Sequence, residues 1–118
     1  MSPPSIANPT YKPIPHPATG SFPTFQAFWP FYLGEHANKT CRRLHLTGTT
    51  FVIGVLATAI TTLQPRLLIY VPLIGYGFAW VGHFFFEHNK PATFKYPVWS
   101  LMSDFKLWWE VATLKRAF

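Results

Sequence analysis

Histidine and glutamate side chains are the groups in this chain whose types and spacing could do chemistry. His83 and Glu87 are four residues apart, so in a helix both project from the same face. His45 lies in a separate segment, and His36 precedes it by nine residues. Imidazole and carboxylate ligands together suit divalent iron, zinc or manganese. The alternative is that the histidines only form hydrogen bonds, with Glu35, with Glu87 or with backbone carbonyls.

Two segments without charge must position these groups. Residues 46–63 and 67–86 contain no charged side chain, and Gln64-Pro65-Arg66 separates them. At about 1.5 Å per residue, helices of these lengths come close to the thickness of a bilayer core. A short polar linker between two such helices makes an antiparallel hairpin, so we expect two transmembrane helices over about 46–63 and 67–86. The alternative is a pair of buried helices in a soluble bundle.

The hairpin would bring distant side chains to one depth. If the turn centres on residues 64–65, antiparallel partners have numbers that sum to about 129 or 130, which places His45 within one turn of His83. His36 and His45 would lie on opposite faces of an unbroken helix, because nine residues rotate by about 900°. Both can face one site only if the chain bends between them, and 38–41 is the expected place. The sequence therefore predicts a site at the open end of the hairpin.

Composition agrees with an apolar environment. The 118 residues fit one domain, and only 12% are charged while 19% are aromatic. The net charge is +6, but the basic residues flank the apolar segments and form no continuous stripe. We therefore expect anionic lipid headgroups as partners and no binding of nucleic acid. Cys41 is the only cysteine, which excludes an intramolecular disulfide and a thiolate metal site.

The basic residues also predict an orientation. Arg66 alone lies in the turn, and the other nine lie before or after the hairpin: Lys12, Lys39, Arg42, Arg43, Lys90, Lys95, Lys106, Lys115 and Arg116. Positive charge accumulates on the cytoplasmic side of membranes. Both termini are therefore expected on the cytoplasmic side or the equivalent matrix side.

The flanking segments complete an all-α prediction. Residues 1–23 contain seven prolines and should form an extended arm, in which His16 is expected to be solvated. Residues 24–118 should form a single helical membrane domain. Its first helix, about 25–44, begins with an aromatic part of interfacial character. A last helix begins at Pro97, with apolar residues at spacings of three and four, and should be amphipathic, lying in the interface or packing on the hairpin.

Two sequence strings resemble motifs of a known family. The first is FYLGEH at 31–36, continuing to RRLHLTGT at 42–49. The second is GYGFAWVGH at 75–83 with Phe86-Glu87, followed by NKPATF at 89–94 and YPVWSL at 96–101. Both are similar to a family of small membrane proteins, the Mpo1-like family, which includes the fungal 2-hydroxy-fatty-acid dioxygenase of α-oxidation. The resemblance covers roughly residues 25–109.

The resemblance implies an iron(II)-dependent oxygenase that uses O2 to shorten a 2-hydroxy fatty acid by one carbon. His36, His45 and His83 match the motif histidines proposed to hold the iron, and Glu87 matches the acid that follows. Asp104 matches a motif acid to which we assign no specific role. On this reading the substrate carboxylate would pair with Arg42 or Arg43, and the acyl chain would lie along the apolar helices.

Two functions follow from these observations. The first is a membrane lipid oxygenase, favoured by the four retained motif residues His36, His45, His83 and Glu87. The second is a non-catalytic accessory subunit of a larger membrane complex, for which the arm at 1–23 would be a docking addition. The resemblance implies the endoplasmic reticulum membrane, while a mitochondrial or bacterial inner membrane stays open.

Overall fold

The computed structural model describes residues 6–88 and 95–118, and the regular elements over these residues are all helices, without strands. The all-α prediction is therefore confirmed. The elements in chain order are α1 (Phe25–Gly34), α2 (Lys39–Thr61), a 3₁₀ helix η1 (Pro65–Ile69), α3 (Tyr70–Val81), a π-helical segment η2 (Gly82–Glu87) and α4 (Pro97–Ala112).

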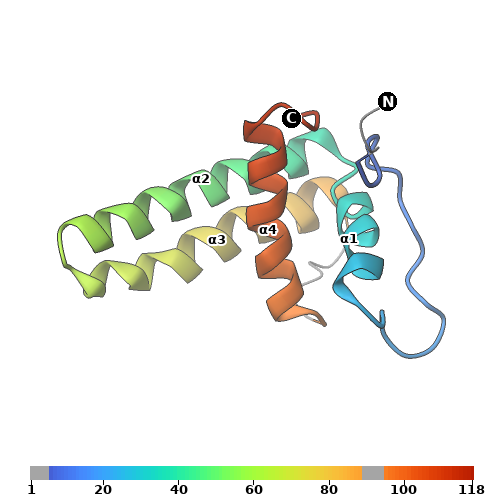
Figure 1. The fold of residues 1–118 in the computed structure, drawn as a ribbon, viewed down its shortest axis with the longest axis horizontal. Coiled ribbons are helices and arrows are strands. Elements are labelled where there is room, and N and C mark those ends of the chain that lie inside the picture. The colour runs from blue at the N-terminus through green and yellow to red at the C-terminus, as the bar shows by residue number, and fades with distance from the viewer. Residues whose placement is uncertain (1–5, 89–94) are drawn as a thin grey trace, which may run out of the picture.

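The predicted hairpin is present. Helix α2 runs antiparallel to the continuous helical stretch Pro65–Glu87, and the two meet at a short turn far from both ends of the chain (Figure 1). Each stretch has 23 residues and is long and apolar enough to cross a membrane. Only 28% and 17% of their most apolar windows are buried within the molecule. Helices at the core of a soluble bundle would be mostly buried, so this exposure favours a lipid environment.

The single helix predicted over about 25–44 is two helices in the structure, because the helix is interrupted between α1 and α2. Gly34 ends α1 where the arm passes so close that an added Cβ would lie 2.6 Å from the Lys12 carbonyl oxygen. Asn38 then begins α2 as its N-cap, with its side chain accepting a hydrogen bond from the Cys41 N–H at 3.0 Å. The bend expected at 38–41 thus lies slightly earlier, at 35–38.

Two glycines let α2 and the second half of the hairpin approach closely. A Cβ added at Gly48 would lie 2.6 Å from the Phe78 Cβ. A Cβ added at Gly82 would lie 3.1 Å from both the carbonyl oxygen and the Sγ of Cys41. These contacts fix the register of the hairpin at its open end.

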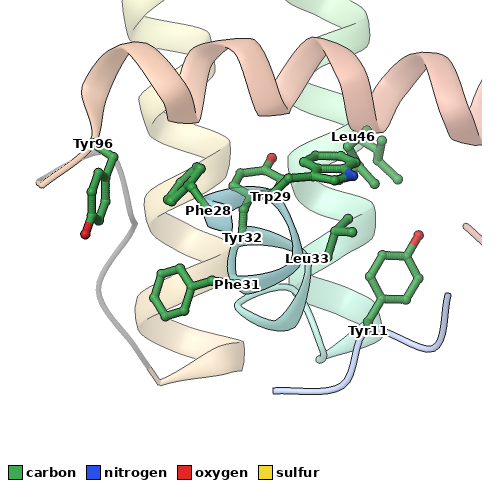
Figure 2. Packing of buried hydrophobic residues seen from close by; sticks show 9 residues of the cluster. Tyr11, Phe28, Trp29, Phe31, Tyr32, Leu33, Leu46 and Tyr96 are labelled. Carbon is green, nitrogen blue, oxygen red and sulfur yellow. The ribbon is translucent and has the colours of Figure 1, made fainter. Parts of the chain in front are cut away.

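Helix α4 runs across the hairpin near its open end, and α1 packs against α4 there (Figure 1). The core lies there too, and its aromatic residues come mainly from α1, as Figure 2 shows. Its buried members are Tyr11, Phe28, Trp29, Phe31, Tyr32, Leu33, Leu46, Tyr96 and Leu107. The core therefore anchors α1 and α4 against the base of the hairpin and leaves the distal part uncovered.

The apolar stripe predicted on α4 lies only partly on its packing face. Ser100, Ser103 and Leu107 are the buried residues of α4, whereas Val98 and Leu101 are exposed. Helix α4 thus packs through Leu107 as well as through small polar residues. Val98 and Leu101 point outward, as is expected for a helix in contact with lipid.

The arm packs on its own chain. The Asn8 Nδ2 donates to the Pro30 carbonyl at 3.0 Å, and the Arg116 Nη1 donates to the Asn8 carbonyl at 2.8 Å. The expectation that His16 is solvated is wrong, because its Nε2 lies 2.6 Å from the Tyr96 hydroxyl and its ring packs on Phe22. The arm therefore contributes contacts to the base of the hairpin.

The close approach at Gly48 gives the first prediction. Replacing Gly48→Ala should destabilise the protein by about 1–3 kcal/mol, because the new Cβ must displace Phe78 near its backbone. Gly54→Ala is the matched control on the same helix, since nothing lies within 4 Å of its added Cβ, and it should be neutral or stabilising. Thermal unfolding in detergent checks both. Equal melting temperatures for the two variants would contradict the proposed register.

Candidate metal centre

Three histidines from separate elements meet at the base of the hairpin. His36 follows α1, His45 lies on α2, and His83 lies in the π-helical segment. One ring nitrogen of each lies within 4.8 Å of the others. The ring centroids of His36 are 4.7 Å from those of both His45 and His83. All three side chains are buried, so the structure brings together the three histidines that the sequence singled out.

Hydrogen bonding determines which nitrogen His36 can offer. Its Nδ1 lies 2.8 Å from the Tyr32 carbonyl oxygen. A carbonyl only accepts, so Nδ1 carries the proton and Nε2 keeps its lone pair. That Nε2 is buried and has no hydrogen-bond partner among the residues that the structure describes.

In His45 the roles of the two ring nitrogens are the reverse of those in His36. Its Nε2 donates to Asp104 Oδ1 at 2.5 Å, and its Nδ1 is buried without a partner in the described part of the chain. Asp104 Oδ1 also accepts from the Tyr32 hydroxyl at 2.6 Å. A carboxylate behind an imidazole is a common device for orienting a metal ligand and raising its basicity. Asp104, whose role the sequence left open, thus lies behind His45.

Burial keeps His36 and Tyr32 neutral. The pKa of His36 is well below its ordinary value because burial disfavours the imidazolium, and His45, His83 and Arg42 add to the effect. The pKa of Tyr32 is well above its ordinary value because of burial and the adjacent Asp104. At neutral pH, His36 is therefore a neutral imidazole that could bind a metal. The Tyr32 phenol keeps the proton that it donates.

Glu87 does not join the histidines in the structure. Its Oε2 accepts a hydrogen bond from the Asn38 N–H at 2.5 Å, so it caps the start of α2. The expected shared face with His83 assumed an α-helix, but 82–87 is π-helical. The hydrogen bond from the Asn38 N–H directs the Glu87 carboxylate to the start of α2. The carboxylate is therefore used at a helix end.

The two arginines expected to bind a substrate carboxylate lie elsewhere as well. The buried Arg42 donates to the His36 carbonyl and to the Phe118 main-chain oxygen, each at 3.0 Å. Arg43 is exposed, and its guanidinium carbon lies 4.8 Å from the centre of the Phe118 ring. Neither residue lines the cavity beside the histidines. Arg42 instead joins the bend after α1 to the last residues of the chain.

A cavity of about 270 Å³ extends from the three histidines between α2, α3 and α4. Tyr32 and Asp104 line it together with the histidines. Apolar side chains make up most of the remaining wall, among them Val52, Val71, Pro72, Ala79, Leu101 and Phe105. The cavity therefore combines a group of possible metal ligands with an apolar space, as a site for a molecule with one polar end would.

Comparison with known proteins agrees with the motif resemblance. A family model described as 2-hydroxy-palmitic acid dioxygenase Mpo1-like matches residues 22–116. The chain belongs to the Mpo1-like family. Searches of curated proteins and of solved structures found no match. The match excludes most of the arm and includes all three histidines, Glu87 and Asp104 of this Mpo1-like protein.

Sequence reasoning missed two residues of the cavity, Tyr32 and Ser100. A signal for each was present, because Tyr32 precedes His36 by four residues and Ser100 precedes Asp104 by four. Residues with this spacing lie on one face of a helix. A search for polar residues one turn from the motif histidines and acids would have found both.

The hydrogen bond behind His45 gives the second prediction. Asp104→Ala should lower the affinity for Fe(II) by about 10–100-fold, because nothing then orients the His45 ring and keeps its lone pair on Nδ1. Glu87→Gln should change it far less, since Glu87 caps α2. Anaerobic titration against a competing chelator measures both affinities. A larger loss in Glu87→Gln than in Asp104→Ala would contradict this assignment.

Proposed function

We propose that this Mpo1-like protein is an iron(II)-dependent membrane dioxygenase that shortens 2-hydroxy fatty acids by one carbon. The observation that carries the proposal is that His36 Nε2 and His45 Nδ1 are buried without partners among the described residues, in two rings that form one group of possible metal ligands with His83. Buried polar atoms without partners are costly, and a cation shared by three imidazoles would satisfy them together. The family description supports the reaction class.

The donor set fits ferrous iron. Neutral imidazoles suit iron, zinc and copper, and a site of three protein nitrogens leaves positions for O2 and substrate. Cys41, the one thiol in the chain, packs against Gly82 and is not part of the histidine group. When bound, the iron would supply the activation of O2.

The residues of the chain would position the reactants. Asp104 and Tyr32 hold His45 in one tautomer, and the Tyr32 carbonyl does the same for His36. The apolar walls exclude water and accept an acyl chain, which leaves the polar end of the substrate directed toward the histidines. Substrate orientation therefore depends on the shape of the cavity more than on a paired arginine.

The bilayer is the proposed environment and the source of substrate. The exposed apolar surface of the hairpin would lie in the hydrocarbon, with the histidines near its boundary. By family resemblance we propose the endoplasmic reticulum membrane, with both termini on the cytoplasmic side. The arm and the last residues lie together at the base of the hairpin, as one shared side requires.

The third prediction concerns turnover. Protein loaded anaerobically with Fe(II) should consume O2 with 2-hydroxyhexadecanoic acid and release the labelled carboxyl carbon. His36→Ala, His45→Ala and His83→Ala should each lose iron and this activity, because each removes one of three ligands. Hexadecanoic acid, which lacks the hydroxyl, is the control substrate. A folded wild-type protein that takes up no iron would contradict the proposal and favour the accessory subunit.

A further inference from the structure

Ser100 has a buried hydroxyl that lines the same cavity as the three histidines. The proposed metal site does not use this hydroxyl. Ser100 lies on α4, one turn before Asp104, and is only 4% exposed. It lines the cavity, yet its Oγ has no hydrogen-bond partner among residues 6–88 and 95–118. An unpaired buried hydroxyl is costly, so a native structure that keeps one needs a reason for it.

Most threonine hydroxyls in and at the ends of the described helices avoid that cost. Seven threonines donate to the carbonyl four residues earlier, namely Thr47, Thr49, Thr50, Thr58, Thr61, Thr62 and Thr113. This is the usual local solution for hydroxyls within helices. For Ser100, the carbonyl four residues earlier belongs to Tyr96. The Ser100 backbone N–H donates to this carbonyl at 2.8 Å, but the Ser100 hydroxyl does not.

The other hydroxyls that line the cavity are already engaged or exposed. Tyr32 donates to Asp104, and Thr49 donates to the His45 carbonyl. Tyr76 is 47% exposed. Within the described lining, Ser100 is therefore the buried hydroxyl whose proton is uncommitted and available to a ligand.

The walls of the cavity indicate how such a ligand would reach it. Tyr76 on α3 and Leu101 on α4 both line the cavity, and both are also exposed on the outer surface of the molecule, at 47% and 56%. The exposed Leu73 and Met102 lie nearby on the same two helices and continue this apolar surface. The edge of the cavity at Tyr76 and Leu101 therefore faces the side on which we place the lipid.

We propose that the cavity binds a single-chain amphiphile from the bilayer, with Ser100 Oγ donating a hydrogen bond to its oxygen-bearing head and the chain leaving between Tyr76 and Leu101. The choice of a 2-hydroxy fatty acid as the amphiphile rests on the proposed function. Ser100 and Asp104 lie one helical turn apart on α4, so a head held at Ser100 lies beside the histidines. Ser100 thereby replaces the arginines as the group that recognises the head.

The fourth prediction measures binding without turnover. Labelled 2-hydroxyhexadecanoate is titrated under anaerobic conditions onto the protein in phosphatidylcholine nanodiscs, with empty nanodiscs subtracted. Ser100→Ala should weaken binding about tenfold or more, as is typical for loss of a hydrogen bond to a charged group. Ser103→Ala is the matched control, because Ser103 is also buried on the same helix, with no partner for its Oγ in the described part of the chain, but does not line the cavity. It should bind like the wild type.

A second pair of variants tests the path of the chain. Leu101→Trp should weaken binding of the same ligand, because the larger ring fills the proposed opening. Met102→Trp is its control, since Met102 is similarly exposed on α4 but does not line the cavity. Equal effects of the two substitutions would overturn the proposed path.

The outcomes separate this inference from the proposed function. Wild-type binding by Ser100→Ala, or equal weakening by Ser103→Ala, overturns the role of Ser100 even if the protein holds iron and turns over substrate. Binding that depends on Ser100 in a protein that never takes up iron supports the inference and contradicts the dioxygenase.

Discussion

Three imidazole rings share one buried space at the base of the hairpin, and this arrangement requires most of the other features of the fold. His36 reaches this space only because the helix is interrupted between α1 and α2. His45 and His83 reach it because Gly48 and Gly82 let the two halves of the hairpin approach closely. Helix α4 runs across the hairpin and supplies the carboxylate behind His45. Each element near the base therefore contributes to holding the three rings together.

The rings are compatible with an apolar environment because they can be neutral. Burying charged groups without partners is expensive, whereas a neutral imidazole needs only hydrogen bonds or a metal. Hydrogen bonds to Asp104 and to the Tyr32 carbonyl satisfy one nitrogen of His45 and one of His36. The opposite nitrogens are left for a shared ligand. Arg42 lies nearby, but its guanidinium is used by main-chain oxygens of His36 and Phe118.

Much of this architecture could be predicted from the sequence by simple geometry. The two segments without charged residues predict the hairpin. Pairing residues across the hairpin from the turn outward predicts that His45 and His83 lie at one depth. The remainder depends on contacts between distant segments. The break after Gly34 reflects the passing arm, and Asp104 meets His45 across 59 residues of sequence. The π-helical segment at 82–87 and the contact of Glu87 with the start of α2 have no local signal that we recognise.

The most direct test of the central claim is X-ray absorption at the iron edge of protein loaded anaerobically with Fe(II). The account predicts a spectrum that requires three imidazole ligands, and a reduced number in each of His36→Ala, His45→Ala and His83→Ala. It also predicts that Glu87→Gln leaves the imidazole count unchanged. A wild-type spectrum that fits without imidazole, or one that none of the three histidine substitutions alters, would contradict the account.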